Sequence, residues 1–399
     1  MSATTTRSLT NRVAALLHDH EPATTPFAEF RRAQYEAGLA WVDNPPCFGG
    51  LNLPRSRQAE IDEALAAAGV PQYPSGHLVA VELAAPTIAR FGTDAQRSRW
   101  LPRIFTCEEM WCQLFSEPGA GSDLASLATK AERAGGDWVV TGQKVWTTLA
   151  HTSEWGLLMA RTDPAVVKHK GITVFAVDMR SAGVEVRPLR QITGDAEYNE
   201  VYLTEVRVPD DNRIGEVGQG WAVAMSTLTS ERATGEAFLG TRESGPLADA
   251  LALWRRADVA HRPAGLRDEL IRCWMQNQLF WLTQERAKAA SDRGTSGPEV
   301  SIGKIAGSLT QQWTYDLCAR IRGAAALLID NYDLVERTEL TQIRNADGDL
   351  NKALLASLAT SIGGGTTNIN KNVIAERVLG LSAEPRADKD TPWNETRRT

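Results

Sequence analysis

Hydrophobic residues change their spacing twice along this chain. Over residues 9–110 they recur every three or four positions, which places them on one face of a helix, and Gly38, Gly69 and Gly92 mark candidate helix ends. From 111 to 209 the chain instead carries short runs rich in β-branched and aromatic residues, which predict strands: DWVVTGQKVW, GITVFAVDM and EYNEVYLTEVRVP. The helical spacing then returns, as in LRDELIRCWMQNQLFWLTQERAKAA and KIAGSLTQQWTYDLCARI.

This order of helices, strands and helices predicts an α+β fold rather than the alternating units of a doubly wound sheet. We place a helical N-terminal domain at 1–110, a central β domain of sheet or barrel type at 111–212, and a helical C-terminal domain at 213–399. The charged tail at 383–399 is expected to be loosely held.

Charge and composition narrow the classes of partner. The chain has 399 residues, 43% of them hydrophobic, and its formal net charge of -6 is spread without a basic block. A protein that binds nucleic acid or an anionic membrane surface needs such a block, so we expect neither partner. No stretch is long and uncharged enough to span a bilayer, and no export signal is recognised, so we expect no membrane anchor.

The five cysteines are scattered and odd in number, and none forms a CxxC pair. This pattern argues against a disulfide framework and against a structural zinc site. We therefore expect a protein of the reducing cytoplasm.

A glycine-rich segment, SEPGAGSD at 116–123, follows the first predicted strand. Its glycines and proline allow a sharp turn and a close approach of the backbone to a flat or anionic ligand. It is neither a complete GxGxxG fingerprint nor a Walker loop. By itself it therefore favours an ordinary tight hairpin loop.

The segments around this loop carry a resemblance. SEPGAGSDLASL is followed by TGQKVWTT and by RPLRQITGDAEYNEVYLTEVRVPDDNRIGEVGQGW, and the chain also contains GTDAQRSRWLPRIF before them and IGGGTTNINKNVIAERVLG after them. Together, in this order, they resemble the acyl-CoA dehydrogenase family over nearly the whole chain. The resemblance implies a helical N-terminal domain, a central β-barrel or sandwich domain and a C-terminal four-helix bundle, with FAD between the last two. It also implies α,β-dehydrogenation of an acyl-CoA thioester, in which a base removes the α-proton and the β-hydride passes to flavin N5.

The resemblance also implies the residues of the site. Trp146 would pack on the isoalloxazine ring, with Thr147 and Thr148 near its N5 edge. The flavin or the thioester would be lined by Gln113, Phe115, Ser116, Gly121 and Ser122. Without the resemblance, Trp146 would be interpreted as one of 12 tryptophans filling a core.

The catalytic base departs from the commonest family pattern. Many members carry it as the glutamate of a Tyr-Glu-Gly-Thr stretch, but the matching position here is Gly364. Isovaleryl-CoA and long-chain acyl-CoA dehydrogenases carry it at a position that matches Glu231. Glu231 interrupts an apolar helical stripe that includes Ala224 and Leu228, so we predict that it is the base, and that Arg232 orients the base or the thioester. The pattern alone favours a solvated acid or a partner of a neighbouring arginine for Glu231, and a surface ion pair for Arg232.

Two segments that grip FAD across the interface of homo-oligomeric members match poorly. The family has Arg-x-x-Phe-Gly and Gln-x-x-Gly-Gly, whereas this chain reads HRPAG at 261–265 and ARIRG at 319–323. The pattern is similar to the base-bearing subunit of bacterial heteromeric steroid side-chain acyl-CoA dehydrogenases. It predicts a homologous partner subunit in a heterotetramer.

Three functional interpretations remain open. The first is a dehydrogenase that passes electrons to an electron-transfer flavoprotein. The second is an acyl-CoA oxidase-type enzyme that passes them to oxygen. The third is a non-catalytic structural subunit. The sequence leaves the acyl group open, because pocket width depends on side chains that converge from several helices.

Overall fold

The computed structural model consists of two compact units, described separately here. Unit 1 comprises Met1–Arg187, Tyr198–Thr227 and Asp390–Thr399, and unit 2 comprises Pro188–Glu197 and Leu228–Lys389. The structure describes residues 3–235, 242–257, 262–292, 300–328, 333, 349–385 and 388–396, with the backbone alone described at 3–8, 229–235, 291–292 and 300.

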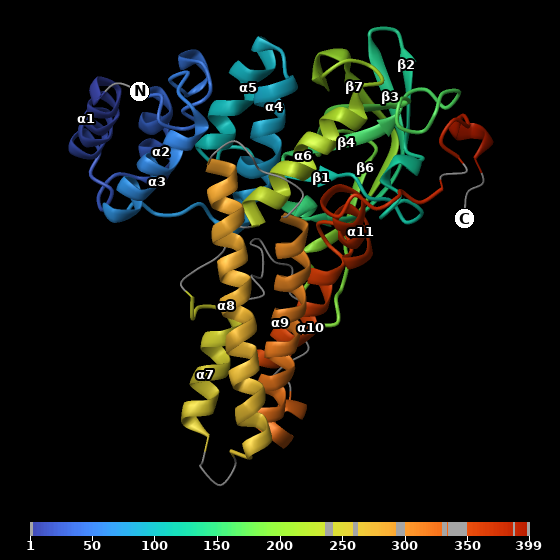
Figure 1. The fold of residues 1–399 in the computed structure, drawn as a ribbon. Helices are drawn as coiled ribbons and strands as arrows, with labels where there is room; N and C mark the ends of the chain where they lie inside the picture. Colours follow the sequence, from blue (N-terminus) through green and yellow to red (C-terminus); the bar gives the residue numbers. More distant parts are fainter. Residues whose placement is uncertain are drawn as a thin grey trace. The chain divides into compact units, whose positions relative to one another are not determined.

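The first part of unit 1 is helical (Figure 1). Apolar side chains of its first helix, including Leu9, Val13 and Leu16, are buried against Phe30 and Ile61. The helices are α1 (Ala3–Asp19), α2 (Phe27–Glu36), α3 (Gln58–Ala67), α4 (Ala85–Phe91) and α5 (Asp94–Phe105).

Helix α5 is tied to the sheet through its N-terminal cap. The Thr93 hydroxyl accepts the Gln96 N–H at 3.2 Å, and the Gln96 side-chain oxygen accepts the Thr93 N–H at 2.9 Å, which is a capping box. The Gln96 amide then donates to the carbonyls of Asp211 at 2.7 Å and Arg213 at 2.8 Å. The Gln96 side chain thus caps the beginning of α5 and fixes the helix to the segment at the start of the last strand, β8 (Arg213–Ile214).

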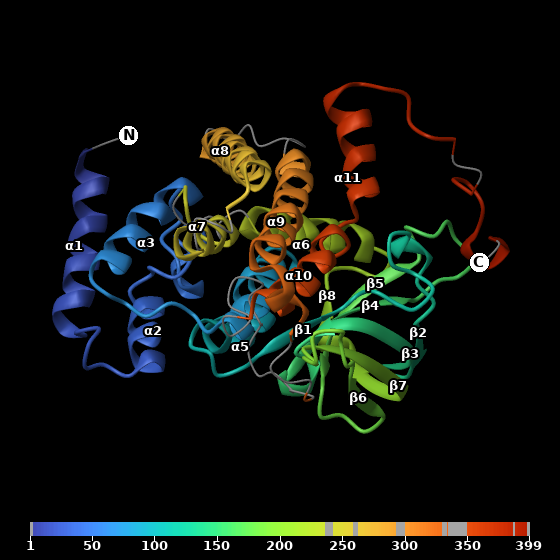
Figure 2. The same ribbon diagram turned by 90° about the horizontal axis from the view of Figure 1, so that it is seen from below.

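The second part of unit 1 is an eight-stranded sheet in the order β6-β7-β3-β2-β4-β5-β8, with β1 added in parallel to β4. Figure 2 shows β6, β7, β3 and β2 side by side. The three predicted strand runs are confirmed as β3, β5 and β7. The strands are β1 (Trp111–Leu114), β2 (Lys130–Ala134), β3 (Asp137–Thr148), β4 (Trp155–Arg161), β5 (Ile172–Asp178), β6 (Val184–Pro188), β7 (Tyr198–Pro209) and β8 (Arg213–Ile214).

Unit 2 is mainly helical, and its central helix α9 packs against α7, α8, α10 and α11. Figure 1 shows α8 and α9 alongside each other. Tyr315, Leu317 and Cys318 of α9 are fully buried in the core of this bundle. The helices are α7 (Pro246–Arg256), α8 (Ala264–Asp292), α9 (Val300–Arg322), α10 (Leu350–Ser357) and α11 (Thr367–Val373), while α6 (Gly220–Gly235) begins in unit 1 and ends in unit 2. The predicted α+β class, with helices before and after a central sheet, is confirmed.

The C-terminal tail departs from its prediction. Residues 383–399 were expected to be loosely held, but Trp393 is only 7% exposed and its N–H donates to the carbonyl of Val166 at 2.9 Å. The N–H of Asn394 donates to the carbonyl of Pro164 at 3.0 Å. The prediction was wrong for 390–396 because one buried tryptophan offsets the polar character of the residues around it.

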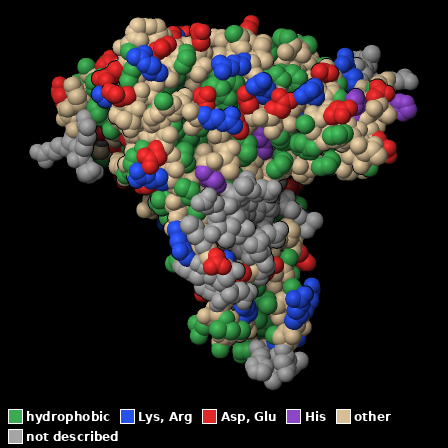
Figure 3. Space-filling view, turned by 180° about the vertical axis from the view of Figure 1, so that it is seen from behind, with side chains coloured by type: hydrophobic (Ala, Val, Ile, Leu, Met, Phe, Trp, Pro, Cys, Tyr) green, Lys and Arg blue, Asp and Glu red, His purple; other side chains and the backbone are tan. Residues whose placement is uncertain are grey.

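Basic and acidic side chains are interspersed over the face that Figure 3 shows. Within the part of the chain that the structure describes, no helix is long and apolar enough to cross a membrane.

Asp210 joins the end of the β2–β3 hairpin to the segment before β8. Its carboxylate accepts the indole N–H of Trp138 at 2.7 Å and two guanidinium N–H groups of Arg213 at 3.0 and 3.2 Å. The hydrogen bonds from Arg213 and then Trp138 lower the pKa of Asp210 to about 2. The ionised form is therefore favoured in the folded protein.

We predict that Asp210→Asn lowers the free energy of unfolding by about 1 kcal/mol near neutral pH. Because the folded pKa lies below the ordinary value of 3.8, the contribution of the carboxylate is complete above that value and is lost as the pH falls toward about 2. Urea denaturation of the parent and the variant across this range should therefore show the difference shrinking in acid. The exposed neighbour Asp211 gives the matched control, Asp211→Asn. A difference in unfolding free energy between the parent and Asp210→Asn that does not change with pH would contradict this account.

Candidate active site

The SEPGAGSD and TGQKVWTT motifs lie side by side in unit 1. The N–H of Val145 in β3 donates to the carbonyl of Ser116 at 3.0 Å, and the Lys144 ammonium donates to the carbonyl of Phe115 at 3.0 Å. The segment after β1 is therefore held against the end of β3. Residues that are about 30 positions apart in the sequence thus form one surface.

A buried ion pair fixes this junction. Lys144 donates to Glu117 at 2.8 Å, and the two side chains are 0% and 8% exposed. The Glu117 carboxylate also accepts the N–H groups of Ala128 at 2.7 Å and Thr129 at 2.9 Å. One carboxylate thus joins the beginning of the SEPGAGSD loop to the residues directly before β2.

Burial and mutual attraction have opposite effects on the two charges of this pair. Burial by itself would raise the pKa of Glu117, but the charge and hydrogen bond of Lys144, with the donors of Thr129 and Ala128, leave that pKa below its ordinary value. Burial lowers the pKa of Lys144, and the attraction of Glu117 offsets this only in part. Each charge therefore depends on the other.

Trp146 stands at a bulge in β3. The pairing of β3 with β7 shifts register between Lys144 and Thr147, and Trp146 has a φ of 61°. Its side chain is 63% exposed and meets Tyr198 edge-on, with 6.3 Å between the ring centroids. The interpretation of Trp146 as a core residue is therefore wrong. A left-handed conformation is unfavourable for a tryptophan, so the surrounding contacts hold its indole outside the core.

Two buried polar atoms in these motifs have no partner among the residues that the structure describes. They are the side-chain nitrogen of Gln113 and the hydroxyl of Thr147, and the Thr147 side chain is 1% exposed. Such atoms are rare in proteins unless a ligand or water satisfies them. The exposed indole of Trp146, which precedes Thr147 in β3, offers a flat face on which a ring system such as a flavin can pack. Thr148, which follows, is half-buried.

The backbone around Thr147 is itself held in place. Its carbonyl accepts the side-chain N–H of Asn199 at 2.9 Å, and the Asn199 oxygen lies 3.1 Å from the Nδ1 of His151. Asn199 is fully buried. The strand end that carries the predicted flavin contacts is thus fixed from the neighbouring strand β7.

The SEPGAGSD segment forms a tight turn that leaves its tip open. Glu117 and Ala120 exchange backbone hydrogen bonds at 3.2 and 3.0 Å. Gly121 and Ser122 are exposed, and a Cβ at Gly121 would meet nothing within 4 Å. The loop is thus the tight turn that its composition predicts, and it leaves room for a ligand to approach.

The predicted base lies in a helix whose side chains are not described at this point. Glu231 and Arg232 belong to α6, but their side chains lie outside the described part of the chain. Gly364, at the position where many relatives carry the base, has a φ of 65°. This left-handed conformation favours glycine over a residue with a side chain.

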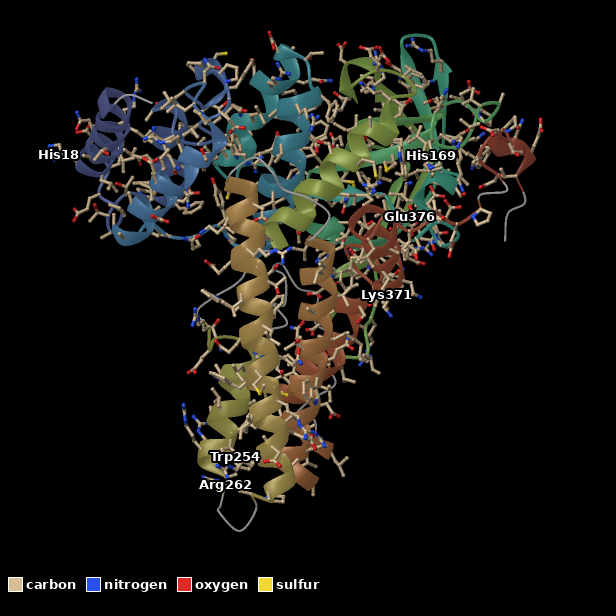
Figure 4. All side chains as sticks on the ribbon, viewed as in Figure 1. His18, His169, Trp254, Arg262, Lys371 and Glu376 are labelled. Atoms are coloured by element: carbon tan, nitrogen blue, oxygen red, sulfur yellow. The ribbon has the colours of Figure 1, made fainter. Side chains whose placement is uncertain are left out.

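The arginines of the two divergent segments contact their own chain. His261 lies outside the described residues, but Arg262 donates to the carbonyls of Ala257 at 2.9 Å and Arg255 at 2.8 Å and lies over Trp254 (Figure 4). Their counterparts near the end of α9 behave alike. Arg320 pairs with Glu269 and Asp316, and Arg322 donates to Asn351.

Sequence reasoning missed Lys144 and Glu117. A signal was present, because Trp138, Val140 and Lys144 occupy inward positions of β3. A lysine at an inward strand position requires a buried carboxylate. Its identity could not be deduced, because Glu117 is 27 residues away.

Protein-family models match nearly the whole length of the chain. The family model described as Acyl-CoA dehydrogenase, N-terminal domain, matches residues 1–108, the middle-domain model matches 112–206 and the C-terminal-domain model matches 218–379. Acyl-CoA dehydrogenase IpdE1 of Mycobacterium tuberculosis is 37% identical over 88% of this chain and 86% of its own length. The chain belongs to the acyl-CoA dehydrogenase family. Membership implies FAD-dependent dehydrogenation of an acyl-CoA, and the relatives are named as such dehydrogenases.

Other acyl-CoA dehydrogenases extend the comparison. FadE34 of M. tuberculosis is 39% identical over 90% of this chain, which spans only 47% of that relative. The solved ChsE4-ChsE5 complex of M. tuberculosis is 28% identical with a TM-score of 0.68, over 96% of this chain and 97% of that one. A Tcur3481-Tcur3483 steroid acyl-CoA dehydrogenase shares the fold, with 24% identity and a TM-score of 0.72 over 96% and 99% of the two chains.

We predict that Lys144→Met lowers the free energy of unfolding by about 3–5 kcal/mol, because it leaves the Glu117 carboxylate buried without its partner. The double variant Lys144→Met/Glu117→Gln should lower the free energy of unfolding by less than the sum of the losses in the single variants Lys144→Met and Glu117→Gln. Lys130, which pairs with Glu132 on the surface, provides the control Lys130→Met, with an expected change within about 0.5 kcal/mol. Urea denaturation followed by tryptophan fluorescence measures all four. Equal stability of the two lysine variants would show that the buried pair is unimportant.

Proposed function

We propose that this chain is the base-bearing subunit of a FAD-dependent dehydrogenase that acts on a bulky acyl-CoA thioester. The observation that carries the proposal is the junction of the two motifs, which exposes Trp146 beside Thr147, whose buried hydroxyl has no partner among the described residues. A structural subunit without a cofactor would have no reason to keep a strained, exposed tryptophan at this point.

Each residue of the junction has a role in this proposal. FAD, when bound, supplies the hydride acceptor. Trp146 would pack its exposed indole against the ring, while Thr147 and Thr148 would hydrogen-bond to its polar edge. The flavin or the adjoining thioester would be lined by Gln113, Phe115, Ser116, Gly121 and Ser122, with Ser122 on the substrate side.

Glu231 is the proposed base. The commonest position of the base in the family is occupied by Gly364, whose backbone favours glycine, and the alternative helix carries a carboxylate. Abstraction of the α-proton requires a carboxylate whose pKa burial raises toward the working range. Arg232 is the proposed positioning residue for this base or for the thioester.

We predict that Glu231→Gln lowers turnover by about a hundred- to ten-thousand-fold, because glutamine keeps the shape of the side chain but cannot take a proton. Folding, flavin content and thioester binding should be retained. The control is Glu216→Gln, since Glu216 lies exposed in the turn before α6. Steady-state turnover of the complete complex decides the matter, and a parent-like rate for Glu231→Gln would place the base elsewhere.

The commoner position of the base, Gly364, can be tested in the Glu231→Gln variant. Glutamate at Gly364 would have to adopt a left-handed conformation, at a cost of about 1–2 kcal/mol. We therefore expect Gly364→Glu to restore the activity of Glu231→Gln only in part.

The proposed assembly includes a homologous partner subunit that completes the cofactor site, in a heterotetramer. Arg262, Arg320 and Arg322 are occupied by contacts within their own chain rather than extended toward a neighbour. One face of α8 also exposes apolar side chains at three- and four-residue steps, which is typical of a protein-binding surface. These side chains, 40–55% exposed, are Ile271, Trp274, Met275, Leu279 and Leu282. The ChsE4-ChsE5 relative is likewise a complex of two named chains.

We predict that the chain expressed alone contains FAD well below one per subunit, and that co-expression with its homologous partner raises the flavin content and solubility. Absorbance of flavin released on denaturation, combined with light scattering, measures both. A fully flavin-loaded, active homotetramer of this chain alone would contradict the heteromeric proposal.

The proposed substrate class is a steroid-type or similarly bulky acyl-CoA thioester, and an electron-transfer flavoprotein is the proposed acceptor. The shared fold of a steroid acyl-CoA dehydrogenase supports the substrate class. Peroxide formed in air at the rate of turnover, without added acceptor, would favour the oxidase alternative.

A further inference from the structure

The C-terminal segment 390–396 lies against the second half of the SEPGAGSDLASL loop. The indole N–H of Trp393 donates to the carbonyl of Ser126 at 3.3 Å, within unit 1. On its other side, Trp393 is tied by its backbone N–H to Val166, and Pro392 forms a bridge with Val167. The chain leaves unit 1 after Thr227 and returns to it only with this segment.

Trp393 covers a buried arginine that binds backbone carbonyls of the SEPGAGSDLASL loop. The Arg161 guanidinium lies 4.6 Å from the centroid of the Trp393 ring and is 3% exposed. It donates to the carbonyls of Ala125 at 2.6 Å, Leu127 at 3.2 Å and Lys168 at 2.7 Å. One cation therefore holds the end of the SEPGAGSDLASL loop to the segment between β4 and β5, and an aromatic face shields that cation from water.

Three contacts thus fix the loop along its length. Glu117 holds its beginning through Lys144, and Lys168 pairs with Asp123 at 2.9 Å in the middle. Arg161 holds its end at Ala125 and Leu127. The exposed residues Gly121 and Ser122 lie between the first two contacts. Their position also depends on Arg161, because Arg161 binds the carbonyl of Lys168, which in turn pairs with Asp123.

We propose that the C-terminal segment is part of the thioester site and that Trp393 is a positioning residue, which acts on Gly121 and Ser122 through Arg161 and Ser126. This inference rests on the proposed function for its ligand, but its structural part does not. Because the flavin-facing end of β3 is held separately by Lys144 and Asn199, loss of Trp393 should disturb thioester binding and leave flavin binding intact.

The test uses the complete complex with its partner subunit and three variants. Trp393→Leu keeps an apolar side chain but removes the aromatic face, whereas Trp393→Phe keeps a smaller aromatic face and loses the indole N–H that binds Ser126. Glu395→Ala changes an exposed side chain of the same segment and serves as the control.

The first readout is amide hydrogen exchange across residues 121–129, which needs no substrate. We expect exchange to be fastest in Trp393→Leu, intermediate in Trp393→Phe, which keeps an aromatic face over Arg161 but loses the bond to Ser126, and close to that of the parent in Glu395→Ala. The second readout is thioester binding, followed through the flavin spectrum. We expect a dissociation constant and a KM raised about tenfold in Trp393→Leu, with flavin content and kcat retained.

Parent-like loop exchange in Trp393→Leu would overturn the inference, and so would a Trp393→Phe variant as loose as Trp393→Leu, because the aromatic face would then be irrelevant. If no thioester perturbs the flavin even in the parent complex, the proposed function fails. The exchange measurement still decides the structural role of Trp393 in that case.

Discussion

The candidate site depends on the buried ion pair between Lys144 and Glu117. Removing two charges from water costs free energy, so a buried ion pair does not in general stabilise a protein much. Here the cost is offset in part by further hydrogen bonds, from Lys144 to the carbonyl of Phe115 and from the N–H groups of Ala128 and Thr129 to Glu117. What the pair supplies is register: it sets the end of β3 against the loop after β1. The left-handed backbone at Trp146 persists next to this junction because its neighbours on both sides are fixed.

Much of the fold follows from periodicity. The strand runs that became β3, β5 and β7 were recognisable because they combine β-branched residues with bounding turns. The tail was mispredicted because composition averages over residues, whereas a single Trp393 decides its docking. The division at 110 and 212 stays a prediction.

The site was less predictable than the fold. The glycine-rich loop and Trp146 have ordinary interpretations in isolation, and only the family resemblance assigned them to a flavin. The partners of Lys144 and Arg161 come from distant parts of the chain, and spacing along one sequence carries no information about such pairs. The exposure of Trp146, and the buried hydroxyl of Thr147 with no partner in the described part of the chain, support the assignment independently of the resemblance. The roles of Glu231 and Arg232 stay predictions.

The most direct measurement is a single turnover without oxygen or any other acceptor. The complex of this chain and its partner is mixed with a steroid-type acyl-CoA thioester, and the absorption of oxidised flavin is followed in time. The account predicts that the absorption bleaches with the parent chain and bleaches far more slowly with Glu231→Gln. If dithionite reduces the flavin but no thioester does so in the parent complex, the chain does not perform the proposed dehydrogenation.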